Sequence, residues 1–202
     1  MVDEDKEIKK RIKQFQADIF NKAISSQEMV WRYIVFDQPF IFRDSQDLFF
    51  EFKKEIARHY NIRPSCVNIA GSSKLGFSIS PEKIWKHITA DSDIDAVIID
   101  PYLFDEYWKK ILEYYNPDNI TPLTQEENDN YSEIRKYFFK GRLRLDLVKP
   151  GIPGMESYIE ITKKTYNKYD NRKVSIGFFR SEDLFEHYHV LNINNIRKKY
   201  GE

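Results

Sequence analysis

Apolar residues recur at helical spacing along the first third of the chain. Between residue 3 and about residue 36, lysine and glutamate separate the apolar positions Ile8, Ile12, Phe15, Ile19 and Phe20. This spacing predicts one or two amphipathic helices. Ser45 is placed to cap a further helix that runs to about His59, with one apolar face formed by Leu48, Phe49, Phe52 and Ile56.

The pattern changes to short apolar runs after Cys66. Residues 67–70 predict a strand that leads into the turn at residues 71–76, and residues 93–99 predict a second strand, which Asp100-Pro101 ends. After this second strand, residues 102–115 are expected to form a helix with Phe104, Trp108, Ile111 and Leu112 on its apolar face. A polar loop is expected over residues 116–130.

The clearest alternation of the chain lies in residues 137–148. There Leu143, Leu145 and Leu147 alternate with Arg142, Arg144 and Asp146, which predicts a strand with one apolar face and one charged face. The Lys140-Gly141 pair predicts a turn that would make this segment a hairpin. After a Pro-Gly break at residues 150–154, we expect a helix over 155–168, a strand over 174–179 and a final helix, capped at 181–183, that runs to about Tyr200.

These elements together predict an α+β fold: a mixed β-sheet flanked by helices, with an N-terminal helical segment. Residues 1–62 are expected to pack as that segment on a core formed by residues 63–202. No repeat or flexible linker divides the chain, so we expect one compact unit.

Composition excludes several classes of protein. The chain has 202 residues, 41% of them hydrophobic, and 32 Lys+Arg against 32 Asp+Glu, which argues against disorder and against a domain that mainly binds phosphate backbones non-specifically. A single cysteine, Cys66, allows neither an internal disulfide nor a cysteine-based zinc site, and the four histidines are not spaced as metal ligands. No secretory signal or membrane-spanning run is visible, so we expect a soluble, cytoplasmic protein.

Candidate chemistry begins with Asp93 and Asp95. Two residues apart on a strand, both carboxylates leave the same face and repel each other. One of them must take a proton, or a divalent cation must lie between them, and hard oxygen ligands of this kind suit Mg²⁺. Asp146 repeats the pattern on the charged face of a later strand, so three carboxylates would converge if the strands are neighbours.

The turn at Gly71-Ser72 is the fourth element. A strand that ends in Gly-Ser and enters a helix presents backbone N–H groups and a hydroxyl where a triphosphate would bind. Gly71 permits close approach of the backbone to the phosphates, and Lys74 is placed to add a positive charge. The residues therefore predict a nucleoside triphosphate bound together with metal ions.

In this order, Gly71-Ser72, Ser92-Asp93-Ile94-Asp95 and Asp146 resemble the signature of the DNA polymerase β-like nucleotidyltransferase superfamily. The turn also resembles that of the minimal nucleotidyltransferases, although Leu75 stands where those proteins often have arginine. The resemblance covers about residues 66 to 149. The interval from Ser72 to Asp93 is longer than in compact members, so we expect residues 77–90 to be an insertion, a loop or short helix, at the mouth of the site.

The resemblance implies a metal-dependent nucleotidyltransferase that uses two Mg²⁺ or Mn²⁺ ions and a nucleoside triphosphate. Asp93, Asp95 and Asp146 would be the metal ligands and catalytic residues. The nucleotide-binding residues would be Gly71, Ser72, Ser73, Lys74 and Arg144. On the alternative interpretation, Arg144, like Arg142, is a solvated residue of an exposed strand face.

Across the superfamily the acceptor is a protein side chain, an RNA 3′ end, a second nucleotide or a small-molecule hydroxyl. We prefer a protein or tRNA, since small stand-alone members resemble toxin–antitoxin or antiviral-defence enzymes. A compact signalling-nucleotide synthase, a catalytically silent nucleotide-binding regulator or antitoxin-type partner, and a nucleic-acid-binding module are the alternatives.

Overall fold

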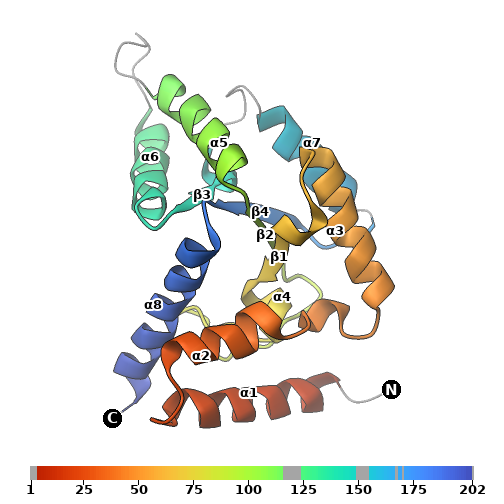
Figure 1. Ribbon diagram of the computed structural model, residues 1–202, viewed down its shortest axis with the longest axis vertical. Helices are drawn as coiled ribbons and strands as arrows, with labels where there is room; N and C mark the ends of the chain where they lie inside the picture. The colour runs from red at the N-terminus through yellow and green to blue at the C-terminus, as the bar shows by residue number, and fades with distance from the viewer. Residues whose placement is uncertain (1–3, 116–123, 149–154, 167, 170, 202) are drawn as a thin grey trace.

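The computed structural model describes residues 4–115, 124–148, 155–166, 168–169 and 171–201. A four-stranded mixed sheet crosses its middle, with helices on both faces (Figure 1). The strand order is β1 (Val67–Ala70), β2 (Ile94–Ile99), β4 (Val174–Phe179) and β3 (Arg142–Arg144). β2 and β4 are parallel, and the two outer strands run antiparallel to their neighbours. The predicted α+β class and mixed sheet are confirmed.

The helices are α1 (Glu4–Phe20), α2 (Ser26–Val30), α3 (Gln46–Tyr60), α4 (Gly71–Leu75), α5 (Pro101–Tyr114), α6 (Gln125–Phe138), α7 (Met155–Tyr166) and α8 (Glu182–Tyr200). A π-helical segment, Trp31–Phe36, continues α2, and three short 3-10 helices cover Phe40–Phe42, Pro64–Cys66 and Leu145–Leu147. Among the helices of the described ranges, none combines the length and apolar character needed to cross a membrane.

The two faces of the sheet carry two separate hydrophobic clusters. On β2, Ile94, Ala96 and Ile98 face a cluster shared with α3, α5, α6 and α7. The alternate residue Val97 belongs to the opposite cluster, which contains α1, α2, α4 and α8. Because β2 is central and covered on both faces, its residues are almost all apolar. Asp95, on the same face as Val97, is the exception.

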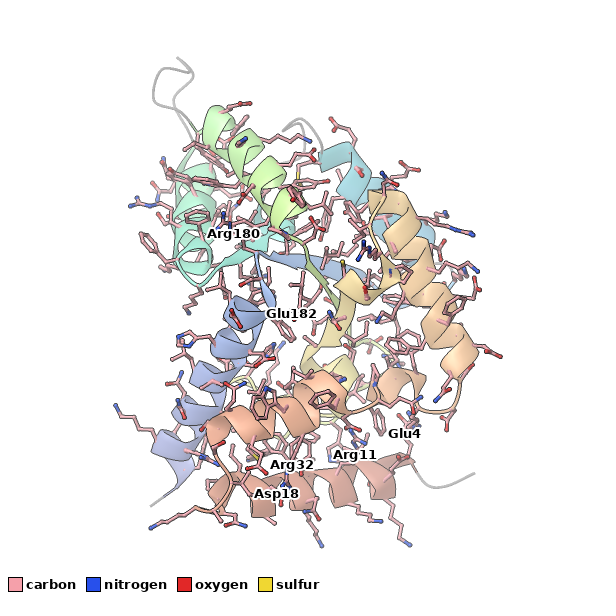
Figure 2. All side chains as sticks on the ribbon, viewed as in Figure 1. Glu4, Arg11, Asp18, Arg32, Arg180 and Glu182 are labelled. Carbon is pink, nitrogen blue, oxygen red and sulfur yellow. The ribbon has the colours of Figure 1, made fainter. Side chains whose placement is uncertain are left out.

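The N-terminal segment contributes to both clusters. α1 buries Ile8, Ile12, Phe15 and Ile19 as its pattern predicts, whereas Phe20 at its end is 41% exposed. Asp18 of α1 joins this helix to the segment after it: the hydroxyl of Tyr33 donates to its carboxylate at 2.6 Å, and Arg32 lies 3.9 Å away (Figure 2). α3, by contrast, packs on the other face of the sheet with α7.

Several helix starts follow from local capping. The side chains of Ser45, Asp100 and Ser181 each accept a hydrogen bond from a backbone N–H of the first turn of α3, α5 and α8. The predicted helix over 155–168 and strand over 174–179 are present as α7 and β4. The Pro-Gly break predicted before this helix, residues 150–154, lies outside the described residues.

The polar loop predicted for residues 116–130 is wrong in its second half. Residues 125–138 form α6, which a capping box starts: the hydroxyl of Thr124 accepts from the N–H of Glu127, and the Glu127 carboxylate accepts from the N–H of Thr124. This reciprocal cap satisfies two N–H groups that would otherwise lack partners. Residues 116–123 lie outside the described part of the chain.

The predicted hairpin at residues 137–148 is also wrong. Tyr137 and Phe138 belong to the last turn of α6, Gly141 follows with a φ of +68°, and only Arg142–Arg144 is a strand. Packing explains the helix: the ring of Phe138 stacks on those of Phe104 and Trp108. Trp108, predicted in the core, covers Phe138 from the surface and is 36% exposed.

Candidate active site

One face of the sheet forms the floor of an open cleft of about 860 Å³. The floor consists of residues of β2, β3 and β4, α8 forms one wall, and the loop between α4 and β2 forms the other. A cleft of this size is at the upper end of the range for small-molecule sites. Its described lining holds five acidic residues, Glu82, Asp91, Asp93, Asp95 and Asp146, and five basic ones, Lys83, Lys86, Arg142, Arg144 and Lys199.

The strand register brings the predicted carboxylates into this cleft. Asp95 of β2 lies between Ala70 of β1 and Ser175 of β4, and the Ser175 hydroxyl donates to its Oδ1 at 3.0 Å. Asp93 precedes β2 by one residue and also lines the cleft. β3 runs antiparallel to β4, so the chain that follows β3 runs toward the end of β4 that carries Ser175. Asp146 lies in this segment and lines the same cleft as Asp93 and Asp95.

The environment of Asp95 opposes its negative charge. Burial raises the pKa of this carboxyl, and the hydrogen bond from Ser175 only partly offsets that effect. Arg142 and Arg144 also lower its pKa, whereas the neighbouring charge of Asp93 raises it. A carboxylate in this position is stabilised by any cation that binds beside it.

Gly71 contacts this same carboxylate. Its φ is +61°, and a Cβ built on it would lie 2.0 Å from Oδ2 of Asp95. Ala70, which precedes it, is paired with Asp95 in the sheet, so the strand register itself forces the turn and the carboxylate together. Glycine is therefore needed here for its backbone conformation and for the space that Asp95 occupies.

Asp146 is held differently, in a bidentate ion pair with Arg144. Nε of Arg144 lies 3.1 Å from Oδ1, Nη2 contacts Oδ2 at 2.5 Å, and the two side chains are 31% and 28% exposed. The pair raises the pKa of Arg144. The guanidinium also lies over the ring of Tyr137, with its Cζ 5.2 Å from the ring centre. The third carboxylate is thus already neutralised by a neighbouring cation.

The donor set suits a hard divalent cation, since it consists of carboxylates and a serine hydroxyl. The Asp93–Asp95 pair has the like-charge repulsion that such an ion relieves, and Asp146 lines the same cleft. Across the described residues, however, no three His, Cys, Asp or Glu side chains lie close enough to share one ion. For Asp146 to join the other two carboxylates, its pairing with Arg144 has to be exchanged for the metal.

The predicted nucleotide-binding residues divide into two groups. Gly71, Ser72 and Arg144 line the cleft. Ser73 and Lys74 lie on the inner side of α4: the buried hydroxyl of Ser73 donates to the carbonyl of Ala70 and accepts from the N–H of Asp95. These bonds connect the turn to β2, so the structure gives Ser73 a positioning contact in place of one with the nucleotide.

Lys74 is 4% exposed, and its ammonium donates to the backbone carbonyl of Asp37. Burial lowers the pKa of this lysine to about 8, although the Asp37 carboxylate acts in the opposite direction. The side chain is absent from the described lining of the cleft. The structure thus directs the Lys74 charge toward the N-terminal segment, away from the place where we predicted a phosphate.

Residues 77–90 form a loop at the mouth of the cleft, as predicted. The loop closes on itself through the bridge between Phe77 and His87, and the N–H of Ser78 donates to the carbonyl of Lys86 at 2.8 Å. Phe77 and Ile88 anchor it in the hydrophobic cluster of α1 and α8. Residues 78–84 and 86–87 line one side of the cleft.

Several lining residues were not predicted from the sequence. Ser175 and Gly177 alternate with apolar residues on β4, and this interruption of an apolar strand is the signal that would have identified them. Tyr188 and His189 of α8 also line the cleft. His189 is buried, which lowers its pKa to about 3, and the nearby Arg142 acts in the same direction. No local signal in α8 distinguishes these residues from an ordinary amphipathic face.

No protein-family model matches the chain, and no curated protein or solved structure matches it either. A function for this cleft is therefore argued from its own residues.

Proposed function

We propose that the protein is a metal-dependent nucleotidyltransferase, which moves a nucleoside monophosphate from a nucleoside triphosphate to a hydroxyl group and releases pyrophosphate. The observation that carries this proposal is the meeting of the Gly71-Ser72 turn with Asp93, Asp95 and Asp146 in one cleft. Each of these features alone is common in proteins. Their convergence from separate segments of the chain is what supports a shared chemical role.

The turn would hold the triphosphate. No side chain caps α4 at Ala70, so the first N–H groups of the helix are available to a ligand. Within the described part of the chain, the Ser72 hydroxyl has no hydrogen-bond partner and lines the cleft beside Gly71. Phosphate oxygens accept hydrogen bonds from such groups. Because α4 is only five residues long, we assign the binding to these donors and not to a helix dipole.

The carboxylates would serve the transfer itself. Mg²⁺ or Mn²⁺ held by Asp93, Asp95 and Asp146 would stabilise the charge on the phosphate oxygens. The acceptor oxygen then forms a bond to the α-phosphorus while the bond to the bridging oxygen breaks, and pyrophosphate leaves with that oxygen. Asp146, the most accessible of the three carboxylates, takes the proton of the acceptor hydroxyl. A protein or an RNA end is the acceptor that we propose.

The test is incubation with each α-labelled nucleoside triphosphate in the presence of cell lysate and Mg²⁺, followed by separation of protein, RNA and small products. Asp95→Asn should lower the transfer of label by at least about a hundredfold, because it removes a metal ligand with little change in size. Asp91→Asn is the matched control, since Asp91 lies two residues before Asp93 in the loop. Equal transfer by wild type and Asp95→Asn would refute the proposal.

A second candidate, nucleotide binding without turnover, is favoured by one observation. Arg144 neutralises Asp146 and keeps this carboxylate in an ion pair. A regulator of this kind would bind a nucleoside triphosphate tightly and release no pyrophosphate. Measurement of nucleotide affinity beside pyrophosphate release separates the two candidates.

A further inference from the structure

The wall that α8 gives to the cleft has a distinct composition. Over three turns of the helix, the cleft is lined by the phenol of Tyr188, the two carboxamides of Asn192 and Asn195, and the ammonium of Lys199. Their spacing of three to four residues places them on one side of the helix. We call these four residues the α8 wall. α8 runs from the sheet to the C-terminus beside α2 (Figure 1).

Arg142 stands between this wall and the floor. Its Nη1 donates to the Tyr188 hydroxyl at 3.0 Å, and its Cζ lies 5.2 Å from the ring centre of Tyr188 and 5.5 Å from that of Tyr137. The guanidinium lies against Gly177 of β4, where an added Cβ would be in ordinary contact with Nε at 3.5 Å. Aromatic rings at such distances hold a guanidinium in place without neutralising it.

The positive charges on this side of the cleft lack acidic partners. Arg144 is paired with Asp146, but Arg142 and Lys199 form no ion pair within the residues that the structure describes, and neither does Lys86 on the opposite wall. Two buried atoms next to the wall also lack hydrogen-bond partners there, Nε of Arg142 and Nδ1 of His189. Buried donors and acceptors without partners are rare in folded proteins, and both of these residues line the cleft.

We propose that the α8 wall and Arg142 bind a nucleotide unit, and that this unit is the acceptor of the transfer. Carboxamides form paired hydrogen bonds with base edges, tyrosine and arginine planes stack on bases, and unpaired lysine and arginine side chains bind phosphate. All three groups are present on one wall. The role as acceptor rests on the proposed function, whereas the binding of a nucleotide unit does not.

The position of the wall supports a site separate from the triphosphate. Gly71 and Ser72 enter the cleft from α4, beside Asp95 and on the β1 side of the sheet, whereas Arg142 lies on β3 at the opposite edge. Two strands, β2 and β4, separate these two elements. Asp93 and Asp95, at β2, lie between the two proposed binding groups, which is where a transferred phosphoryl group has to be.

The experiment measures binding without catalysis, in EDTA. Pentaribonucleotides of each base, labelled with fluorescein at the 5′ end, are titrated with the full-length protein and followed by anisotropy. Lys199→Gln and Arg142→Gln should each weaken binding about tenfold, because each removes a charge-assisted phosphate contact. Lys198→Gln is the matched control, since this neighbour on α8 is exposed and does not line the cleft. Lys199 is exposed as well, so its substitution tests the wall even if Arg142→Gln fails to fold.

Competition identifies the source of the nucleotide unit. Displacement of the label by 5′-mononucleotides as well as by RNA indicates a free nucleotide, and displacement by RNA alone indicates an RNA end; both support the inference. A glutamate-rich peptide that displaces the label equally well would overturn it, as would equal losses in the Lys198 and Lys199 variants. Label transfer that proceeds normally in Lys199→Gln would refute the acceptor role and leave the proposed transferase activity intact. Nucleotide binding without any transfer would refute the activity and with it the acceptor role, and would leave the binding of a nucleotide unit intact.

Discussion

Gly71→Ala is the substitution whose effect the structure specifies most closely. An L residue in the left-handed region costs about 1–2 kcal/mol. The new Cβ would also lie 2.0 Å from Oδ2 of Asp95, so one of the two groups has to move, at about 1–3 kcal/mol. We expect the free energy of unfolding to fall by about 2–5 kcal/mol in total.

The two contributions separate in an Asp95→Ala background. Removal of the carboxylate leaves the added Cβ in ordinary contact with the Cβ of residue 95, at 3.4 Å, so only the backbone cost of about 1–2 kcal/mol remains. Urea unfolding of the wild type, both single variants and the double variant gives the coupling energy. We expect a coupling of about 1–3 kcal/mol between positions 71 and 95.

Gly141→Ala is the matched control for this cycle. Gly141 has a similar φ, +68°, and an added Cβ would lie 2.5 Å from Leu184, but the contact is far from Asp95. Its cost should be the same with and without Asp95→Ala. If the effects of Gly71→Ala and Asp95→Ala add within about 0.5 kcal/mol, the added Cβ does not clash with the Asp95 carboxylate. That result would refute the predicted coupling between positions 71 and 95.

Three further outcomes are expected. Burial raises the pKa of Asp95 in the folded protein, so ionisation of this carboxyl destabilises the fold as pH rises through that pKa, and Asp95→Asn should increase the free energy of unfolding at neutral pH but not in acid. Equal gains at both pH values in urea titrations would contradict this. Arg144→Gln frees Asp146 from a partly exposed ion pair and should tighten Mg²⁺ binding about two- to fivefold, measured as the Mg²⁺ dependence of the melting temperature. Unchanged affinity would count against Asp146 as a ligand. Thr124→Ala removes the capping box with Glu127 and should lower the free energy of unfolding, measured by urea denaturation, by about 1 kcal/mol. An effect below about 0.3 kcal/mol would mean that α6 does not depend on its cap.

Elements set by local interactions were predictable from the sequence. Ser45, Asp100 and Ser181 each stand just before an apolar pattern of helical period, and each caps the helix that follows. The start of α6 carried the same kind of signal, Thr124 with Glu127 three residues later. The run of acids and asparagines after it has the polar composition of a loop, and composition alone therefore predicts the wrong structure here.

The failure at residues 137–148 has a tertiary cause. Tyr137 and Phe138 favour strands by propensity, but Phe138 has a helical position from which it stacks on Phe104 and Trp108. Leu143 and Leu145 are buried as the alternation predicts, although Leu145 already belongs to a 3-10 turn. Alternation therefore identified which side chains face the core but not how long the strand is.

The candidate site was predictable to the extent that it interrupts regular patterns. A carboxylate within an otherwise apolar central strand is conspicuous, and so is Gly-Ser after a strand. Contacts that depend on long-range packing were not visible: Lys74 is buried against Asp37, 37 positions earlier, and Arg142 contacts Tyr188, 46 positions later. A sequence pattern on one element cannot show which face of a distant helix will cover it.

The two arginines of β3 show how the charges of the cleft are divided. Arg144 neutralises the accessible Asp146, whereas the carboxylate of Asp95, which burial makes the costlier charge, has a serine hydroxyl as its one hydrogen-bond partner in the described part of the chain. Arg142 and Arg144 lower the pKa of Asp95 through space, but among the described residues neither donates a hydrogen bond to its carboxylate. On the proposed function, a cation would supply the counter-charge of Asp95 and an anion that of Arg142. A metal–nucleotide complex supplies both charges at once, which is the physical reason for placing catalysis in this cleft.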